Sequence, residues 1–323
     1  MSWTNWERVT GTGLEFTDII YEKKFHTELE GGIARISVNR PEKYNALTNH
    51  SADEMFRAFY DANHDPAIGV VVLTGVGNHF GTGGDVEWEQ WGLREAFYFR
   101  YPMNRLVRLS RKPIVAAVQG YCIGGHNHMA YCCDFTIAAD TAIFGQAGPR
   151  VSSPADGFFV PYLTRVIGAK RAREMWMLCR RYTAHEAYQM GLVNKVVPLE
   201  RLGDEVDRWC EEMLVLSPGC LEILKATFDQ EMDTFPDMGI LSSRLYPDWF
   251  DSPEGKEGPA AFMEKRKPRF WNLRKQAAQT ATGSPQTSAS AKKPSPPRKV
   301  LPVPNSTSKK RTTTGKATTK KRA

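Results

Sequence analysis

The 323-residue sequence predicts an α/β fold, followed by a helical region and a disordered basic tail. Short apolar segments rich in β-branched residues, at 70–73 and 113–118, are typical of strands buried on both faces. Glycines and then a segment that suits a helix follow such strands, and repeated strand-then-helix units indicate an α/β architecture. From residue 276 onward Pro, Ser, Thr and Lys dominate and large apolar residues are nearly absent, which predicts disorder.

The first part of the chain is predicted to form an arm, a hairpin and a helix. Residues 1–18 form a polar N-terminal arm. Residues 19–25 and 33–38 have the pattern of two strands, joined as a hairpin across 28–32. Apolar side chains recur at helical spacing in 50–63, before the strand at 70–73.

Helical patterns dominate the second half of the chain. After the strand at 113–118, a helix is expected at 126–133 and a further apolar strand at 135–139. The remaining expected elements are helices at 162–168, 169–179, 184–190, 202–216 and 218–229, with a short strand at 193–197. The predicted organisation is an N-terminal arm (1–18), an α/β core (19–215), a C-terminal helical region (216–275) and a disordered basic tail (276–323).

Composition and charge narrow the class of protein. With 41% hydrophobic and 24% charged residues, the chain has the composition of a soluble globular protein. No apolar run reaches the ~18 residues of a membrane span, and the N-terminus has no secretory pattern, so we expect a cytoplasmic protein with no membrane partner. The net charge is +7, but residues 281–323 hold eleven basic and no acidic residues, which leaves −4 on residues 1–280.

The basic tail has two interpretations. Its charge could attract nucleic acid or an acidic partner through weak contacts. Alternatively it is a solvated tail with no dedicated partner. The six cysteines lie mostly in apolar segments and include no C-x-x-C pair, so we expect buried, reduced thiols and no metal site.

Two glycine turns carry the first indication of chemistry. The strand at 70–73 leads to Phe-Gly-Thr-Gly-Gly-Asp at 80–85, and the strand at 113–118 leads to Gly124 and Gly125 before a helix. A glycine turn at a helix N-terminus leaves bare backbone N–H groups, and two such groups that converge can stabilise an oxyanion. Either turn alone is an ordinary turn signal.

The pairing of FGTGGD with VQGYCIGGHNHMAYCCDFTIAAD resembles the enoyl-CoA hydratase/isomerase (crotonase) superfamily. Residues 39–47, 143–146 and 187–198 support this resemblance. Within the superfamily, CRRYTAHEAYQMGLVNKVVP and EGKEGPAAFMEKRKPRF are most similar to the branch of naphthoate synthase and 2-ketocyclohexanecarboxyl-CoA hydrolase. The resemblance implies a spiral of ββα turns, an acyl-CoA substrate, no cofactor beyond its CoA moiety, and a homotrimer or dimer of trimers formed through C-terminal helices.

The resemblance also assigns binding residues. It places the two oxyanion donors on the backbone N–H groups of Gly84 and Gly125. Thr82 and Ala46 would line the path of the CoA moiety. Lys43 is either a ligand of the CoA phosphates or a solvated lysine, and Phe250 occupies the substrate-site position at which the branch has a tyrosine.

The acid–base residues depart from the family pattern. Ordinary hydratases have two glutamates, and His128 and Gly148 stand at these positions here. The branch's Ser-x-Asp motif reads Ser153-Pro-Ala-Asp156. Asp156 instead matches the position of the base of dienoyl-CoA isomerase and of the nucleophile of 4-chlorobenzoyl-CoA dehalogenase. It is either catalytic or a helix N-cap.

The two histidines of this segment are expected to have different roles. His128 either relays protons near the thioester or is a packed histidine bonded to backbone. His126 is expected to face differently, and a His126/His128 metal pair is disfavoured because residues i and i+2 do not share a helix face.

These assignments predict an acyl-CoA enzyme that stabilises a thioester enolate. Asp156 would be the general base or acid, with His128 and Ser153 placing a water or the substrate. Hydrolytic C–C cleavage (ring opening) or the related condensation, on a cyclic or aromatic acyl-CoA, is the leading reaction. The alternatives are an enoyl-CoA hydratase/isomerase with atypical catalytic residues, and a non-catalytic protein of this fold that binds RNA or a partner through its tail.

Overall fold

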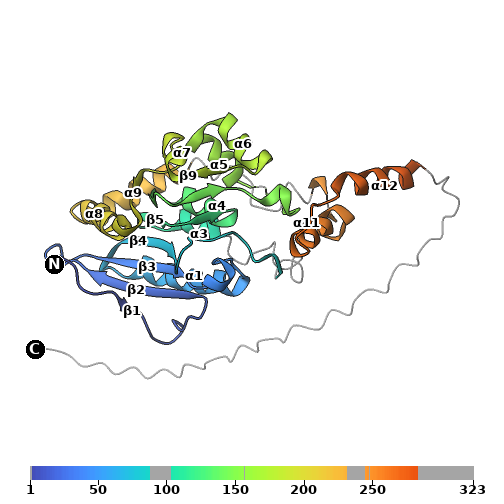
Figure 1. Ribbon diagram of the computed structural model, residues 1–323. Helices are drawn as coiled ribbons and strands as arrows, with labels where there is room; N and C mark the ends of the chain where they lie inside the picture. Colours follow the sequence, from blue (N-terminus) through green and yellow to red (C-terminus); the bar gives the residue numbers. More distant parts are fainter. Residues whose placement is uncertain (1, 88–102, 156, 231–243, 247, 283–323) are drawn as a thin grey trace, which may run out of the picture. The chain divides into compact units, whose positions relative to one another are not determined.

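The computed structural model describes residues 2–87, 103–155, 157–230, 244–246 and 248–282 (Figure 1). Backbone contacts divide the chain into two units, 1–279 and 280–323. Of the second unit only residues 280–282, the end of a helix, are described. The expected tail therefore lies outside the described residues from 283 onward.

A seven-stranded sheet organises the first unit, in the order β1-β2-β3-β4-β5-β7-β10. β1, β2 and β3 pair antiparallel, and every pair from β3 to β10 is parallel. The strands are β1 (Glu7–Arg8), β2 (Ile19–Phe25), β3 (Gly32–Val38), β4 (Ile68–Gly75), β5 (Ile114–Val118), β7 (Phe135–Ala139) and β10 (Lys195–Val197). The expected hairpin is thus confirmed, and the N-terminal arm adds its own strand to the edge of the sheet.

A second, three-stranded sheet has the order β6-β8-β9. Its strands are β6 (Tyr121–Ile123), β8 (Ile143–Gly145) and β9 (Arg181–Thr183). β5 is followed by β6 and helix α4 (Gly125–Cys132), and β7 is followed by β8, so successive turns of the chain give one strand to each sheet. The expected α/β spiral of ββα turns is confirmed.

The helices follow the expected order and extend beyond it. They are α1 (Asn49–His64), α3 (Met103–Leu109), α5 (Phe159–Ile167), α6 (Ala169–Leu178), α7 (Ala184–Gln189), α8 (Leu202–Leu214), α9 (Pro218–Gln230), α11 (Pro253–Met263) and α12 (Phe270–Thr282). Local chemistry sets their starts: Thr48 and Ser51 form a reciprocal capping box at α1, as Thr183 and Glu186 do at α7. α12 continues past residue 276, where we expected the tail to begin.

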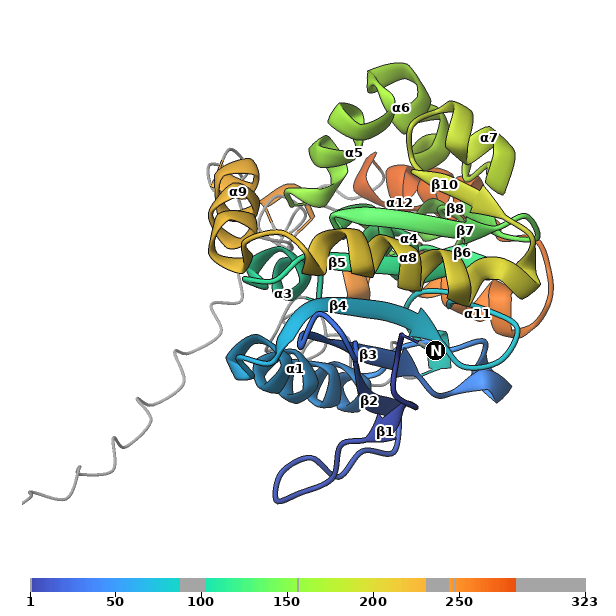
Figure 2. The same cartoon turned by 90° about the vertical axis from the view of Figure 1, so that its left-hand side faces the viewer.

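Each face of the large sheet covers a hydrophobic core. On one face α8 lies across the strands (Figure 2), and Val206, Cys210 and Met213 of this helix pack with side chains such as Val115 and Ile137. All five side chains are buried. Val115 and Ile137 fit strands enclosed on both faces, which carry apolar residues in both directions.

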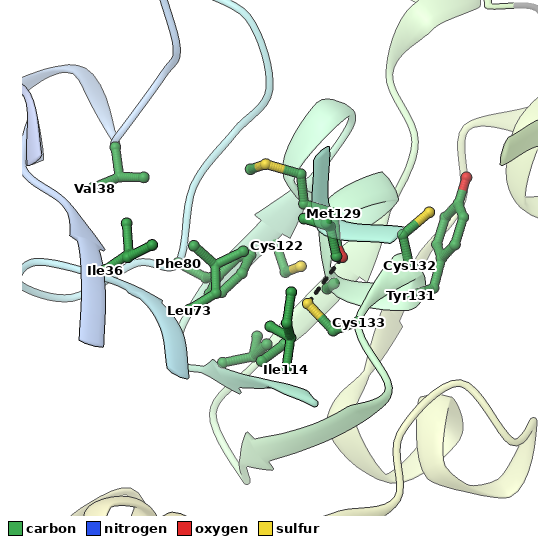
Figure 3. Close-up of a cluster of buried hydrophobic side chains, with 14 of the residues drawn as sticks. Ile36, Val38, Leu73, Phe80, Ile114, Cys122, Met129, Tyr131, Cys132 and Cys133 are labelled. Carbon is green, nitrogen blue, oxygen red and sulfur yellow. Dashed lines mark hydrogen bonds between the residues drawn. The ribbon is translucent and has the colours of Figure 1, made fainter. Parts of the chain in front are cut away.

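The opposite face holds the larger core, which includes α1 and α4. Figure 3 shows part of it, where Ile36 and Leu73 of the sheet lie near Phe80 and Met129. Cys122, Cys132 and Cys133 belong to this cluster, and burial raises the pKa of all three thiols. Their reactivity as thiolates is therefore suppressed, as expected of structural cysteines.

None of the helices in the described segments combines the length and the apolar composition that a membrane span requires.

The buried cluster predicts a large effect of truncating Leu73. This side chain is fully buried, so Leu73→Ala is expected to lower the free energy of unfolding by about 2–5 kcal/mol. Leu199→Ala makes the same change at a side chain that is 49% exposed and is expected to cost less than about 1 kcal/mol. Denaturant unfolding measures both values, and equal losses would contradict this account of the core.

Candidate active site

The first glycine turn, residues 80–85, is anchored on both sides by backbone hydrogen bonds. The amide of Gly81 donates to Tyr121 O (2.8 Å), at the start of β6. The amide of Leu47 donates to Gly83 O (2.8 Å), and the amide of Asp85 donates to Leu47 O (2.9 Å). The segment before α1 therefore pairs with this turn as a short bridge.

Polar side chains hold that segment in place. Asn45 is fully buried at φ +57°, and its Nδ2 donates to Val76 O (3.0 Å) and His79 O (2.7 Å). Arg40 donates to the carboxylate of Asp85 (3.0 Å) and to Ala46 O. Asp85 directly follows Gly84, so this ion pair ties the turn to the segment that contains Ala46.

The second glycine turn joins β6 to α4. Gly124 lies at φ +61° and ψ −126°, a conformation open only to glycine. Its amide donates to Gly145 O (3.0 Å), at the end of β8. α4 then begins at Gly125, whose N–H belongs to the unpaired first turn of the helix.

The two turns meet backbone to backbone. A Cβ atom on Gly83 would lie 3.1 Å from the amide nitrogen of Gly125, and a Cβ atom on Gly125 would lie 3.9 Å from the amide nitrogen of Gly84. Among the hydrogen bonds of the described residues, neither the Gly84 nor the Gly125 amide is a donor. Two amides from segments some forty residues apart therefore lie close together with their donor capacity unused.

His126 lies beneath the first turn. Its ring is fully buried, and its Nδ1 accepts a hydrogen bond from the Gly83 amide (3.0 Å). Burial lowers the pKa of His126 to about 3, so its imidazole is neutral at pH 7. The two histidines were expected to face in different directions. The ring of His126 contacts the first glycine turn, whereas that of His128 contacts Gln146 and Phe159.

His128 faces an aromatic and amide environment. It stacks on Phe159 (centroids 4.5 Å apart) and lies 5.0 Å from the ring of Trp176. Its Nε2 hydrogen-bonds Gln146 Oε1 (3.0 Å), which leaves Nδ1 as the acceptor nitrogen. Burial lowers the pKa of His128 to about 4, against an opposing effect of Gln146, so this imidazole is also neutral near pH 7.

Unpaired polar atoms surround His128. Gln146 Nε2 and Trp176 Nε1 are buried hydrogen-bond donors without a partner among the described residues. A buried donor without an acceptor is costly. The pattern of residue types gave no sign of these donors, because Gln146 and Trp176 are both distant in sequence from His128, the residue that they contact.

The loop after β8 holds the other predicted acid–base residues. Asp156 lies outside the described residues. Helix α5 has Phe158 as its N-cap, without a side-chain capping bond. The amide of Ser153 donates to Gly148 O (3.0 Å), but its neighbour Ser152 makes the long-range contacts.

Ser152 joins this loop to the C-terminal helices. Its backbone is left-handed (φ +54°), and its Oγ donates to Glu254 O (2.8 Å) in α11. Trp249 Nε1 donates to Ser152 O (2.9 Å), next to the half-buried Phe250. Sequence reasoning missed Ser152, because only the three-dimensional contacts distinguish it from Ser153.

The predicted CoA-binding residues lie around the first turn. Lys43 is exposed and forms an ion pair with Glu87 (3.1 Å), which raises the pKa of the lysine. Ala46 is buried, and Thr82 Oγ1 lies 3.4 Å from Tyr44 O. Among the described side chains, no group of three or more His, Cys, Asp or Glu residues is placed to hold a metal ion.

Comparison with solved structures gives relatives that match most of this chain. An enoyl-CoA hydratase/carnithine racemase from Magnetospirillum magneticum is 29% identical, with a TM-score of 0.62, and the match covers 79% of this chain and 96% of that one. An enoyl-CoA hydratase from Mycobacterium avium subsp. paratuberculosis K-10 is 25% identical, with a TM-score of 0.64, and the match covers 79% and 99%.

A methylmalonyl-CoA decarboxylase in complex with 2-nitronate-propionyl-CoA is 26% identical, with a TM-score of 0.70 and coverage of 79% and 99%. The sequence model of the enoyl-CoA hydratase/isomerase family matches residues 28–273. This range includes both glycine turns, the loop that follows β8 and α11. The chain belongs to the enoyl-CoA hydratase/isomerase family, whose members act on CoA thioesters.

Proposed function

We propose that this protein binds an acyl-CoA and stabilises the enolate of its thioester with the amides of Gly84 and Gly125. The observation that carries the proposal is the close approach of two glycine turns whose amides have no acceptor among the described residues. Prealigned N–H groups that face a developing oxyanion contribute on the order of 10²–10³ in rate for each donor.

The reaction we favour is hydrolytic C–C cleavage of a cyclic β-keto acyl-CoA, or the related condensation on an aromatic acyl-CoA. Aromatic rings of Phe159 and Trp176 beside His128 suit a flat or cyclic acyl group. The unpaired donors of Gln146 and Trp176 suit an acyl group that carries its own acceptor oxygen. A simple linear enoyl chain offers neither feature.

Proton transfer is assigned to Asp156, on sequence grounds, and to His128. A neutral imidazole whose Nε2 donates to Gln146 carries its lone pair on Nδ1, so it can accept a proton or order a water and does not act as a cationic acid. Ser153 would place the water or the substrate. Phe250 would contact the acyl group.

Binding of the CoA moiety is assigned to the segment before α1 and to the first turn. Ala46 and Thr82 would line its path, and Lys43 would exchange Glu87 for a CoA phosphate. No cofactor beyond the CoA moiety enters this scheme. Exposed apolar residues of α9, Ile223, Leu224 and Phe228, would be covered in a homotrimer or a dimer of trimers.

Two alternatives remain as proposals. The relatives described as enoyl-CoA hydratases favour a hydratase or isomerase with atypical catalytic residues. The eleven basic residues of 281–323 favour a non-catalytic protein that binds RNA or an acidic partner through its tail. In each case we place the protein in the cytoplasm.

A panel of linear, alicyclic and aromatic acyl-CoA thioesters, followed by mass spectrometry, distinguishes these functions. We expect turnover of a cyclic or aromatic acyl-CoA, with a mass gain of one water for ring opening. Turnover of linear enoyl-CoA alone supports the hydratase alternative. If no thioester reacts and the protein retains RNA at physiological salt, the non-catalytic alternative replaces the proposal.

The oxyanion site predicts different effects for two helical glycines. A methyl group at Gly125 would lie in van der Waals contact with Gly83 Cα (3.4 Å) and 3.9 Å from the Gly84 nitrogen. Gly125→Ala is therefore expected to hinder the approach of the thioester oxygen to the two amides and to lower kcat at least 10-fold. The matched control is Gly203→Ala in α8, where the added methyl group would meet no other segment of the described residues within 4 Å. Both glycines lie in the first turn of a helix, so the two changes alter the local helix propensity in a similar way. Steady-state kinetics combined with a thermal melt separates the effect on the reaction from the effect on folding. A wild-type kcat in Gly125→Ala would show that the Gly125 amide does not take part in the reaction.

A catalytic role for Asp156 predicts a selective loss of turnover. Asp156→Asn is expected to lower kcat at least ~10²-fold while acyl-CoA affinity stays within a few-fold, as for a residue that transfers a proton. Asp140→Asn, at an exposed aspartate, serves as the control. Full turnover in Asp156→Asn would exclude the acid–base assignment.

Burial of His128 predicts a pH-dependent stability. Above about pH 6.5 its imidazole is neutral in both the folded and the unfolded chain. As the pH falls from 6.5 to about 4, the unfolded chain binds a proton and the folded chain does not, so stability decreases. Below pH 4 both states are protonated and this dependence ends.

His128→Gln is therefore expected to reduce the slope of unfolding free energy against pH between 6 and 4.5 by up to about 1.4 kcal/mol per pH unit. Denaturant unfolding at several pH values measures this slope. His185→Gln, which removes an exposed histidine of α7, is the control. An unchanged slope in His128→Gln would show that this imidazole is not held neutral.

A further inference from the structure

The ring of His126 occupies space that only a glycine at position 81 leaves open. A Cβ atom on Gly81 would lie 2.2 Å from the ring, at Cδ2 and Nε2. The edge of the ring also packs against Phe80, with centroids 5.7 Å apart and an angle of 86° between the planes. The imidazole is thus enclosed by the first glycine turn, although it belongs to the helix that follows the second.

The hydrogen bond to Gly83 fixes the protonation of this ring. A backbone amide only donates, so Nδ1 of His126 must carry the lone pair and Nε2 the proton. The low pKa of the buried imidazole agrees with this neutral form. Nε2 has no partner among the described residues, so Nδ1 makes the hydrogen bond that orients the ring.

Gly83 is held from both sides as a result. Its N–H binds His126, and its carbonyl accepts from the Leu47 amide (2.8 Å). Gly83 lies at φ +93°, and because it has no side chain its torsions depend strongly on these backbone hydrogen bonds. In a trans peptide the carbonyl of Gly83 and the N–H of Gly84 point in opposite directions, so fixing Gly83 aims the Gly84 N–H away from Leu47.

We propose that His126 is a positioning residue, whose imidazole holds the Gly83 amide so that the N–H groups of Gly84 and Gly125 face one acceptor atom. The proposal rests on the oxyanion function proposed above. His126 itself does not touch the substrate in this scheme. Its α4 location also links the two turns, because the helix that starts at Gly125 carries the acceptor for Gly83.

The experiment compares two substitutions that differ in the acceptor. His126→Leu fills much of the volume and has no acceptor, whereas the Oδ1 of His126→Asn can take the place of Nδ1. We expect kcat to fall 10- to 100-fold in His126→Leu with a KM within about three-fold of wild type, and to recover at least five-fold in His126→Asn. The control is Asn127→Leu, which removes a neighbouring buried polar side chain. Among the described residues, the one hydrogen bond of the Asn127 amide is to Met175 Sδ (3.4 Å), and wild-type kcat is expected.

Two readouts do not require a substrate. Nitrogen NMR of the His126 imidazole is expected to show a proton on Nε2 and a bare Nδ1 at neutral pH. Hydrogen exchange of the Gly83 amide is expected to be at least 10-fold faster in His126→Leu than in wild type, and to slow again in His126→Asn.

Each outcome decides the proposal. A protonated Nδ1 in the wild-type protein overturns it, even if His126→Leu does not fold. Faster exchange at Gly83 with unchanged kcat also overturns it, because the turn would then move without effect on the reaction. If the wild-type protein turns over no acyl-CoA, the proposed function fails, and the tautomer and Gly83 exchange alone decide whether His126 holds the turn.

Discussion

Two glycine turns approach each other until their backbones touch, and the structure around them is arranged so that they can. Any side chain on Gly83 would lie 3.1 Å from the Gly125 nitrogen, which would separate the turns. The first turn follows β4 of the large sheet, and the second turn follows β6 of the small sheet. The hydrogen bond from the Leu47 amide to Gly83 O holds the first turn to the segment before α1. The hydrogen bond from the Gly124 amide to Gly145 O holds the second turn to β8. These backbone hydrogen bonds fix the orientation of the amide dipoles. Little reorganisation of the protein is therefore needed when negative charge develops on a bound oxygen.

On the side of α4, the described side chains nearest this contact are polar but uncharged, whereas the Arg40–Asp85 ion pair lies on the side of the first turn. His126 and His128 are neutral because burial disfavours the imidazolium, and the donors of Gln146 and Trp176 carry no charge. Hydrogen bonds and dipoles are stronger in a site that excludes water. Such a site stabilises a transient anion through oriented N–H groups, and it leaves proton transfer to few residues. The family resemblance places His128 and Gly148 where ordinary hydratases have two glutamates, and this difference supports the proposal of a reaction other than simple hydration.

The elements predicted from the sequence are mainly those whose apolar pattern extends over several residues. The apolar run at 113–118 became β5, and the amphipathic pattern at 202–216 became α8. The strands of the second sheet are three residues long and were not predicted, whereas β10, which is equally short, was expected within 193–197. Family resemblance placed Gly84 and Gly125, but nothing in the sequence pattern pointed to the bond from Gly83 to His126 or to that from Ser152 to Glu254. These contacts join residues 43 and 102 positions apart, and only tertiary packing decides them.

The most direct measurement of the central claim is the infrared carbonyl band of a bound, unreactive acyl-CoA labelled with ¹³C at the thioester carbon. Two hydrogen bonds to one carbonyl oxygen polarise the C=O bond, so the band is expected to shift to lower frequency on binding. Gly125→Ala should reduce that shift, and Gly203→Ala should preserve it. A bound thioester whose carbonyl band stays at its frequency in water or moves higher would contradict convergence of the Gly84 and Gly125 amides on the substrate.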